Sequence, residues 1–198
     1  MQRYLHPGDY SIQIRSEIKA LITEGSDMKL AVAETARVSY MKGKFNRRYD
    51  IANIFFLMTE YDDALTFAPA ADENSTGDLI YFLPTGEPVE NTQVYECIEQ
   101  TVAGESPETA PTKWQVFNRR NPFVNLKLID LIIYDLNAKY ARRSMPQTVV
   151  DRYMDAKEWV DEVSAGDIDA DLPQKSITDP GFSVDLRFNS HPCENQRY

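Results

Sequence analysis

The chain has 198 residues, 42% of them hydrophobic, which suffices for one core of moderate size or for one domain that carries a smaller insert. No apolar run approaches the roughly 20 residues that span a bilayer, and the start lacks the regions of a secretory signal, so we expect a soluble, intracellular protein without a membrane partner. The net charge of −10 lies in one block, because twelve acidic and no basic residues between Glu60 and Thr112 leave the remainder at +2, and this asymmetry predicts two parts with different surfaces.

Three helices are predicted before the acidic block. Apolar residues spaced by three and four positions predict the first over residues 11–22, and Gly25 ends it. A capping Ser or Asp then begins a second helix, which Gly43 ends. A third segment, residues 49–61, also has an apolar face of helical period. The inner face of the second helix is expected to consist of Met28, Ala31, Val32, Thr35 and Val38.

The acidic block has a different pattern. Proline and glycine recur at turn spacing and separate short apolar stretches such as "DLIYFL" and "TQVYECIEQ". This punctuation favours short strands over helices. We therefore predict a three-stranded β insert over residues 65–117.

Two helices follow the block. Asn121 and Pro122 have the form of an N-cap with proline in the first turn, and the helix they begin is apolar nearly all round except for Lys127, Asp130, Tyr134 and Asn137. Such a helix is expected at the centre of a bundle or at a subunit interface. A last helix of 4,3,4,3 apolar spacing is ended by Gly166. Core or subunit packing is assigned to Leu126, Ile129, Ile133, Leu136, Tyr140 and Trp159.

The tail contains a predicted strand, "FSVDLRF", at residues 182–188. Its hydrophobic residues alternate strictly with polar ones, which gives the strand one apolar face. Such a strand after a helical bundle can pair with the sheet edge of another protein or cover its own core, and the sequence leaves both open. The residues of this candidate partner-binding arm are Phe182, Val184, Leu186 and Phe188.

Catalytic or metal-binding groupings are not indicated. His191 and Cys193 form one pair of possible ligands without a second pair at finger-like spacing. The stretch "DENSTGD" (72–78) begins like a calcium loop, but Leu83 stands where that loop needs a glutamate, so an acidic turn is the better interpretation. Cys97 and Cys193 lie far apart in sequence and are predicted to be free thiols. We predict no enzyme activity, no catalytic residue, no metal and no cofactor.

The predicted helices resemble a family of phage proteins. The stretch "AVAETARVSYMKGKFNRRYDI" (31–51) is similar to the early helices of phage head-to-tail connector proteins. Residues 121–173 resemble the Mu-like prophage neck proteins in "NPFVNLKLIDLIIYDL", "MPQTVVDRYMDAKEW" and "AGDIDADLP".

This resemblance implies a small helical adaptor, a structural protein of the virion neck that is made in the host bacterial cytoplasm. It implies a ring of about twelve copies beneath the portal protein, joined to tail or stopper proteins. Genomic DNA would pass through the lumen without sequence recognition. Members of this group use a C-terminal arm to grip the portal, and residues 182–188 stand where that arm would be.

The β insert carries a second resemblance. Residues 77–117 are similar to small chitin- and cellulose-binding modules, in which a surface aromatic residue stacks on a sugar ring. Tyr95 and Trp114 are the possible glycan contacts, and Trp114 is equally suited to the core of the module. The pattern is carried by Gly77, Asp78, Tyr95, Cys97, Thr101, Gly104, Pro107 and Trp114.

Together these patterns predict a mainly α fold in four parts. Residues 1–64 and 118–172 form the two halves of a small helical bundle, residues 65–117 the inserted acidic β module, and residues 173–198 an extended arm. The predicted function is that of a head-to-tail adaptor, and the alternative is a glycan-binding protein that takes part in host attachment. An enzyme that uses carboxylates of the acidic block is a third hypothesis.

Overall fold

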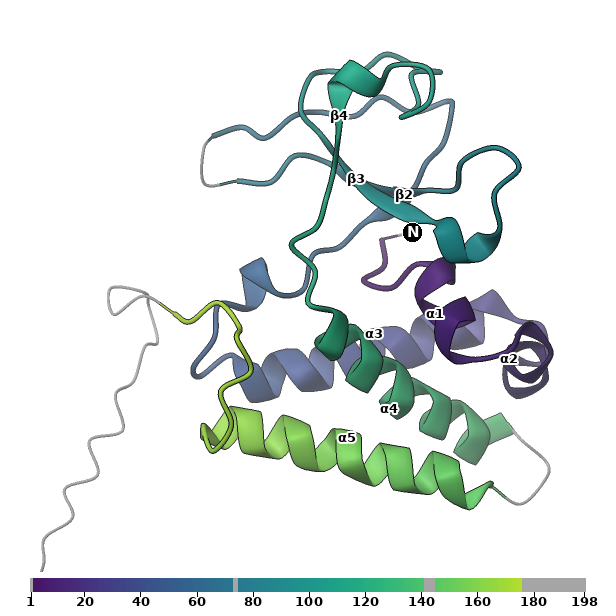
Figure 1. Cartoon of the computed structure of the whole chain (residues 1–198), viewed down its shortest axis with the longest axis vertical. Coiled ribbons are helices and arrows are strands. Elements are labelled where there is room, and N and C mark those ends of the chain that lie inside the picture. The colour runs from purple at the N-terminus through teal and green to yellow at the C-terminus, as the bar shows by residue number, and fades with distance from the viewer. Residues whose placement is uncertain (1, 73–74, 141–144, 176–198) are drawn as a thin grey trace, which may run out of the picture.

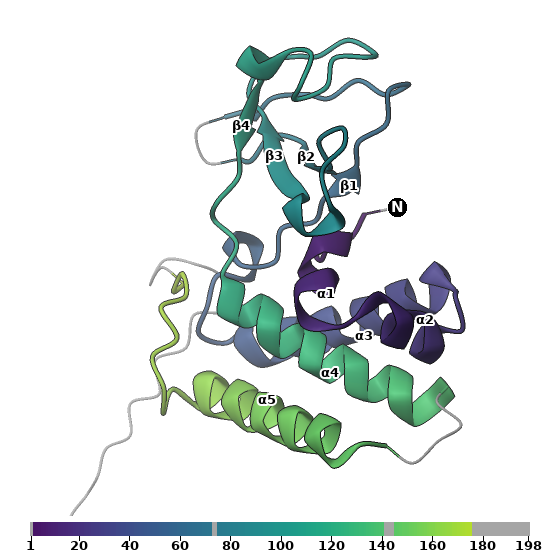
Figure 2. The ribbon, with the colours of Figure 1, turned by 45° about the vertical axis from the view of Figure 1, so that its right-hand side comes forward.

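The computed structural model describes residues 2–72, 75–140 and 145–175. In these ranges it contains five α-helices and one small mixed sheet of four strands, so the fold is rich in helix, as predicted. Figures 1 and 2 show the helices gathered at one end of the molecule and the sheet at the other, with the N-terminal segment between them. None of the described helices is both long and apolar enough to cross a membrane.

The predicted first helix is in fact two helices. Helix α1 (Pro7–Gln13) begins at a proline, and the Asp9 side chain accepts a hydrogen bond from the backbone of His6 in a capping box. Ile14 is extended, which separates α1 from α2 (Ser16–Thr23). Gly25, with φ of 71°, follows α2 as the sequence predicts.

Helix α3 (Asp27–Phe45) lies where the second helix was predicted, but it continues two residues past Gly43, which was predicted to end it. Only two of the five residues of the predicted inner face are buried. Ala31 and Val38 are buried, whereas Met28, Val32 and Thr35 are exposed. The helix is turned so that a carboxylate, Glu34, points inward with the hydrophobic residues. The buried residues of α3 are Leu30, Ala31, Ala33, Glu34, Val38, Met41 and Phe45.

The predicted helix over residues 49–61 is wrong. Only the short 3-10 helix η1 (Ile51–Asn53) forms there, and the chain then runs extended into strand β1 (Thr59–Glu60). Adjacent residues of an extended chain point to opposite sides. Phe55 therefore enters the core of the helices while Phe56 enters the core of the sheet.

The sheet has four strands in the order β1-β2-β3-β4, not the predicted three. Strands β2 (Leu79–Phe82), β3 (Gln93–Cys97) and β4 (Trp114–Val116) are antiparallel neighbours, whereas β1 is parallel to β2. Strand β1 precedes residue 65, where the insert was predicted to begin. The short 3-10 helices η2 (Val89–Asn91) and η3 (Pro111–Lys113) lie in the connections between strands.

Each face of the sheet has its own small core. One core contains Leu79 and Tyr81 of β2 together with Val94 of β3. The other, which we name the outer core of the sheet, contains Ile80 of β2 and Trp114 of β4. Because neighbouring residues of a strand face opposite ways, β2 supplies both cores.

The last two helices follow the sequence prediction. The side-chain oxygen of Asn121 accepts hydrogen bonds from the first turn of α4 (Pro122–Tyr140), and Gly166, with φ of 86°, ends α5 (Gln147–Ala165). Helix α4 packs against α1, α2, α3 and α5, so it is the central helix of this end of the molecule. The residues after α5 return to η1, where Asp50 N donates to Pro173 O over 2.8 Å.

The predicted polar stripe of α4 is partly wrong, because Lys127 and Asp130 are buried. Both face charged residues of α5: Lys127 pairs with Asp155, and Asp130 lies 3.4 Å from Arg152. Burial raises the pKa of Asp130, an effect that Arg152 opposes. These two residues of the stripe therefore bind a neighbouring helix and do not face solvent.

Candidate functional site

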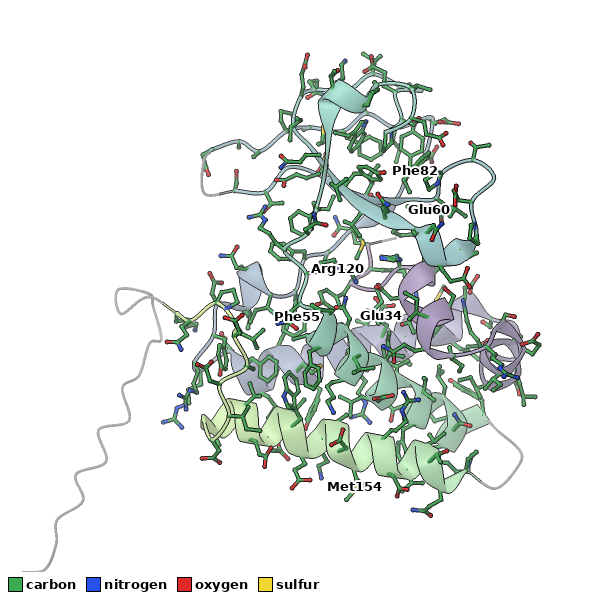
Figure 3. The ribbon with its side chains drawn as sticks, viewed as in Figure 1. Glu34, Phe55, Glu60, Phe82, Arg120 and Met154 are labelled. Atoms are coloured by element: carbon green, nitrogen blue, oxygen red, sulfur yellow. The ribbon has the colours of Figure 1, made fainter. Side chains whose placement is uncertain are left out.

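The carboxylate of Glu34, which lies between the helices and the sheet, is the centre of a buried polar cluster in the described part of the chain (Figure 3). Its Oε1 accepts hydrogen bonds from the backbone N–H groups of Tyr4 and Leu5, at 2.8 and 3.0 Å. Its Oε2 accepts from the Tyr10 hydroxyl at 3.1 Å and from Arg3 Nε and Nη2 at 3.1 and 2.8 Å. Five donors from the N-terminal segment thus surround one side chain that is 3% exposed.

These five hydrogen bonds hold the N-terminal segment against α3, and we name them the Glu34 lock. Burial raises the pKa of Tyr10 well above its usual value, with a further contribution from the negative charge of Glu34. Burial acts to lower the pKa of Arg3, but the Glu34 carboxylate outweighs it and the pKa is raised. Because both oxygens are already occupied by donors, Glu34 is poorly placed to act as a general base.

A second polar cluster lies beside the first and joins α1 to the start of α4. Arg120 Nη2 donates to Asp9 Oδ2 at 2.6 Å and to the carbonyl oxygen of Tyr4 at 2.9 Å. His6 Nε2 lies 3.3 Å from Asp9 Oδ1. Burial lowers the pKa of His6 to about 4, although Asp9 opposes the shift, so the imidazole is neutral at neutral pH. Arg120 and Asp9 are 111 residues apart in the chain, so no local sequence pattern indicates that they pair.

The residues predicted for core or subunit packing lie in the helical core. Ile129, Ile133, Leu136 and Trp159 are buried, and the Trp159 ring meets the Phe45 ring edge to face at a centroid distance of 6.0 Å. Leu126 and Tyr140 are only half-buried.

The two possible glycan contacts lie in the sheet. Trp114 is 6% exposed, and its Nε1 donates to the carbonyl oxygen of Glu105 at 3.1 Å, so this indole belongs to the outer core of the sheet. Tyr95 is half-buried beside it, with its ring 6.4 Å from that of Phe82. The structure therefore gives Trp114 a packing role and leaves Tyr95 partly accessible.

Several other predicted residues cannot be placed. The predicted arm (Phe182, Val184, Leu186 and Phe188) and the pair His191 and Cys193 lie outside the described residues. Cys97 is buried, and its Sγ lies 3.1 Å from the carbonyl oxygen of Glu99. Burial raises the pKa of this thiol, which lowers its reactivity. Within the described ranges, no three His, Cys, Asp or Glu side chains come together in a way that could hold a metal ion.

One end of the helical part has an exposed apolar surface, which we name the apolar end. It is formed by the last residues of α1, by α2 and by the first two turns of α3, which lie together in Figures 1 and 2. Two of its side chains, Met28 and Val32, were predicted to be buried. The apolar end consists of Ile12, Ile18, Leu21, Met28 and Val32, which are 47 to 71% exposed.

Comparisons with protein-family models, with curated proteins and with solved structures found no significant match to this chain.

Proposed function

We propose that this chain is a structural adaptor of a phage head-to-tail connector, and that it assembles into a ring through its helical part. The observation that carries the proposal is the apolar end. Exposed apolar side chains gathered at one end of a small protein favour association, because their exposure to water is unfavourable.

The apolar end agrees with the sequence pattern of α3. This helix has apolar residues on two faces, and one chain covers only the face that contains Leu30, Val38 and Met41. The opposite face begins with Met28 and Val32. A second copy of the chain would cover this exposed face, so that both apolar faces of α3 would be buried.

The Glu34 lock supports a geometric role. It ties the N-terminal segment to α3, and the same segment meets the sheet through the bridge between Arg3 and Met58. An adaptor must hold its neighbours at fixed relative positions, and such buried polar links between layers favour one arrangement.

The acidic surface of the sheet fits a protein that DNA passes. Nine of the described acidic residues of the block are exposed: Glu60, Asp62, Asp63, Asp72, Asp78, Glu87, Glu90, Glu99 and Glu108. Negative charge on a lumen would reduce adhesion of phosphate groups, since affinity for DNA grows with each cation that neutralises a phosphate. A basic neighbour in the neck is the other surface that this block would suit.

The resemblance of residues 31–51 and 121–173 to connector proteins names the partners. These are the portal protein on one side and a tail or stopper protein on the other. The virion neck is the proposed location, and the proposed role involves no catalysis.

The experiment that tests this proposal is inactivation of the gene in its phage, followed by electron microscopy of the particles. Heads that fill with DNA and then leak, or that lack tails, would support the adaptor. Expression of the wild-type chain from a plasmid should restore complete particles. Intact particles that fail only to adsorb to the host would contradict the proposal.

A glycan-binding role is the second candidate, and one observation favours it. The outer face of the sheet carries three partly exposed aromatic side chains, Tyr61, Phe82 and Tyr95, around the buried Trp114. Aromatic faces of this kind stack on sugar rings. Retention of the full chain on chitin or cellulose, lost on Phe82→Ala with Tyr95→Ala, would support this role, and failure of the wild-type chain to bind these polymers would count against it.

A further inference from the structure

The outer face of the sheet carries three neighbouring aromatic rings that are only partly covered. Tyr61 follows β1, Phe82 ends β2 at the sheet end of the molecule (Figure 3), and Tyr95 lies in β3. The ring centroids of Tyr61 and Phe82 are 5.4 Å apart, and those of Phe82 and Tyr95 are 6.4 Å apart. All three side chains are half-buried, so together they form one partly exposed surface, which we name the aromatic row.

Carboxylates lie at both ends of the aromatic row. Burial and then the Asp63 carboxylate raise the pKa of Tyr61 to about 12. At the other end, burial and then the negative charge of Glu108 raise the pKa of Tyr95. Glu108 is held in place, because Thr85 N and Oγ1 donate to its two carboxylate oxygens at 2.9 and 3.1 Å. A ligand on the row therefore meets negative charge at either end.

The charge of this face is not balanced by a cation. Lys113 is the only Lys, Arg or His between residues 60 and 116. Its Nζ already donates to Glu105 Oε2 at 2.7 Å, so this lysine neutralises Glu105 and no other carboxylate. Three exposed carboxylates near the row form no ion pair with a described residue: Asp62, Asp63 and Glu108.

Two further carboxylates of the strands belong to the opposite face. Glu60 Oε2 accepts from the Tyr81 hydroxyl at 3.3 Å, and Glu96 Oε2 lies 3.3 Å from Arg119 Nη2. Arg119 also belongs to that face, because its guanidinium lies 4.8 Å from the centroid of the Phe117 ring. The opposite face therefore contains its own cation, whereas the uncompensated charge lies on the outer face.

We infer that the outer face binds an arginine-containing basic segment of a neighbouring protein. The face of an aromatic ring attracts cations, and a planar guanidinium can both stack on a ring and bond to a carboxylate. DNA is disfavoured on this face by the sign of its charge. A neutral sugar would use the rings alone and would gain nothing from the net charge around them.

This inference rests on the proposed function, because it names the surface on which the adaptor would hold a basic neighbour in the neck. The aromatic row supplies the contact area, and the carboxylates at its two ends select the sign of the partner.

The first measurement is the binding of two labelled peptides to the full-length chain by fluorescence anisotropy. The probes are an octa-arginine and an octa-lysine peptide, which carry the same charge at neutral pH. We expect the wild type to bind the arginine peptide about threefold to tenfold more tightly, because the guanidinium stacks on the aromatic row. Added salt should weaken the binding of both peptides.

A pair of charge variants tests the carboxylates. The face variant carries Asp62→Asn and Asp63→Asn, and the matched control carries Glu17→Gln and Glu158→Gln on the exposed surfaces of α2 and α5. Both variants change the net charge equally, and all four positions are exposed, so both should keep the circular dichroism of the wild type. The face variant should bind each peptide about threefold to tenfold more weakly, and the control should stay within about twofold of the wild type.

A pair of aromatic variants tests the aromatic row. Phe82→Leu with Tyr95→Leu keeps apolar side chains at both positions but removes their rings, so the preference for arginine over lysine should disappear. The matched control is Phe123→Leu, which removes a 45% exposed ring from α4 and should leave the preference unchanged.

Four results would overturn the inference. These are a wild type that binds neither peptide at low salt, a charge control that weakens binding as much as the face variant, and a folded aromatic variant that keeps the arginine preference. The fourth is retention of the wild type on chitin without binding of the arginine peptide, which would assign the face to glycans. Defective necks after gene inactivation, together with any of these results, would reject this surface and leave the adaptor proposal standing.

Discussion

The helical part and the sheet of this molecule reach stability by different means. Among the described residues, the helices share one continuous core of 25 buried residues, whereas the two cores of the sheet contain six and four. The sheet is completed by loops whose backbone bonds to side chains, such as Phe67 N to Thr101 Oγ1 at 2.8 Å. A four-stranded sheet with so little apolar burial depends for its stability on the part of the molecule that it packs against. The Glu34 lock lies between the two parts.

The largest effect is expected from Glu34→Ala. The change leaves the Arg3 guanidinium and two backbone N–H groups buried without their acceptor, so the free energy of unfolding should fall by about 3 to 5 kcal/mol. Urea denaturation measures the loss. Glu158→Ala, at an exposed position of α5, is the control and should change little. A loss below about 1 kcal/mol for Glu34→Ala would show that the lock does not stabilise the fold.

The next effect distinguishes the two regions. Trp114→Ala leaves a cavity in the outer core of the sheet, so the free energy of unfolding should fall by about 3 kcal/mol. The sheet should be destabilised more than the helices. Amide hydrogen exchange should rise in β2, β3 and β4, while α4 and α5 keep their protection. Exchange that rises equally in both regions would show that helices and sheet unfold as one unit.

A smaller effect should appear as pH falls. The pKa of His6 is about 4 in the folded chain, below the unfolded value of about 6.5. Stabilisation by the neutral imidazole is therefore present above about pH 6.5 and is lost as the pH falls toward 4. Between about pH 7 and pH 5 the loss should be about 2 kcal/mol. Over the same interval, the free energy of unfolding of the His6→Gln variant should fall by about 2 kcal/mol less than that of the wild type. An equal pH dependence in both proteins would contradict the assignment.

The smallest effects come from two glycines given the same substitution. Gly166 has φ of 86° and lies against the Arg48 guanidinium, so Gly166→Ala should destabilise the protein by about 1 to 2 kcal/mol. Gly43 lies in α3 with open space around its Cβ position, so Gly43→Ala should stabilise by about 0.5 to 1 kcal/mol. Thermal unfolding of the two variants should shift in opposite directions.

The sequence predicted the helical part better than the sheet, for physical reasons. Helices α4 and α5 are long, and their caps at Asn121 and Gly166 are local signals. Residues 49–61 misled the prediction because consecutive aromatic residues serve two cores, and that spacing imitates a helix. Strand β1 has two residues and pairs in parallel, so no turn signals it.

The candidate sites were harder to predict than the elements. Glu34 is in phase with Leu30 and Val38 on α3, which is a visible signal, but its partners lie about thirty residues upstream. The sequence pattern places Met28 and Val32 on one apolar face of α3. No local pattern indicates which of the two apolar faces is buried against the rest of the same chain. The choice depends on where α1 and α4 pack, and that is a property of the whole fold.

The β-bridge between Tyr49 and Gln174 joins the residues just before η1 to the chain after α5, and it determines where a pulling force on that chain would act. Two backbone hydrogen bonds, Asp50 N to Pro173 O at 2.8 Å and Lys175 N to Arg48 O at 3.1 Å, fasten this segment antiparallel to residues 48–50. Tension applied beyond Lys175 therefore loads these bonds before it reaches α5. The pull enters the molecule between α3 and η1, where Tyr49 belongs to the main helical core.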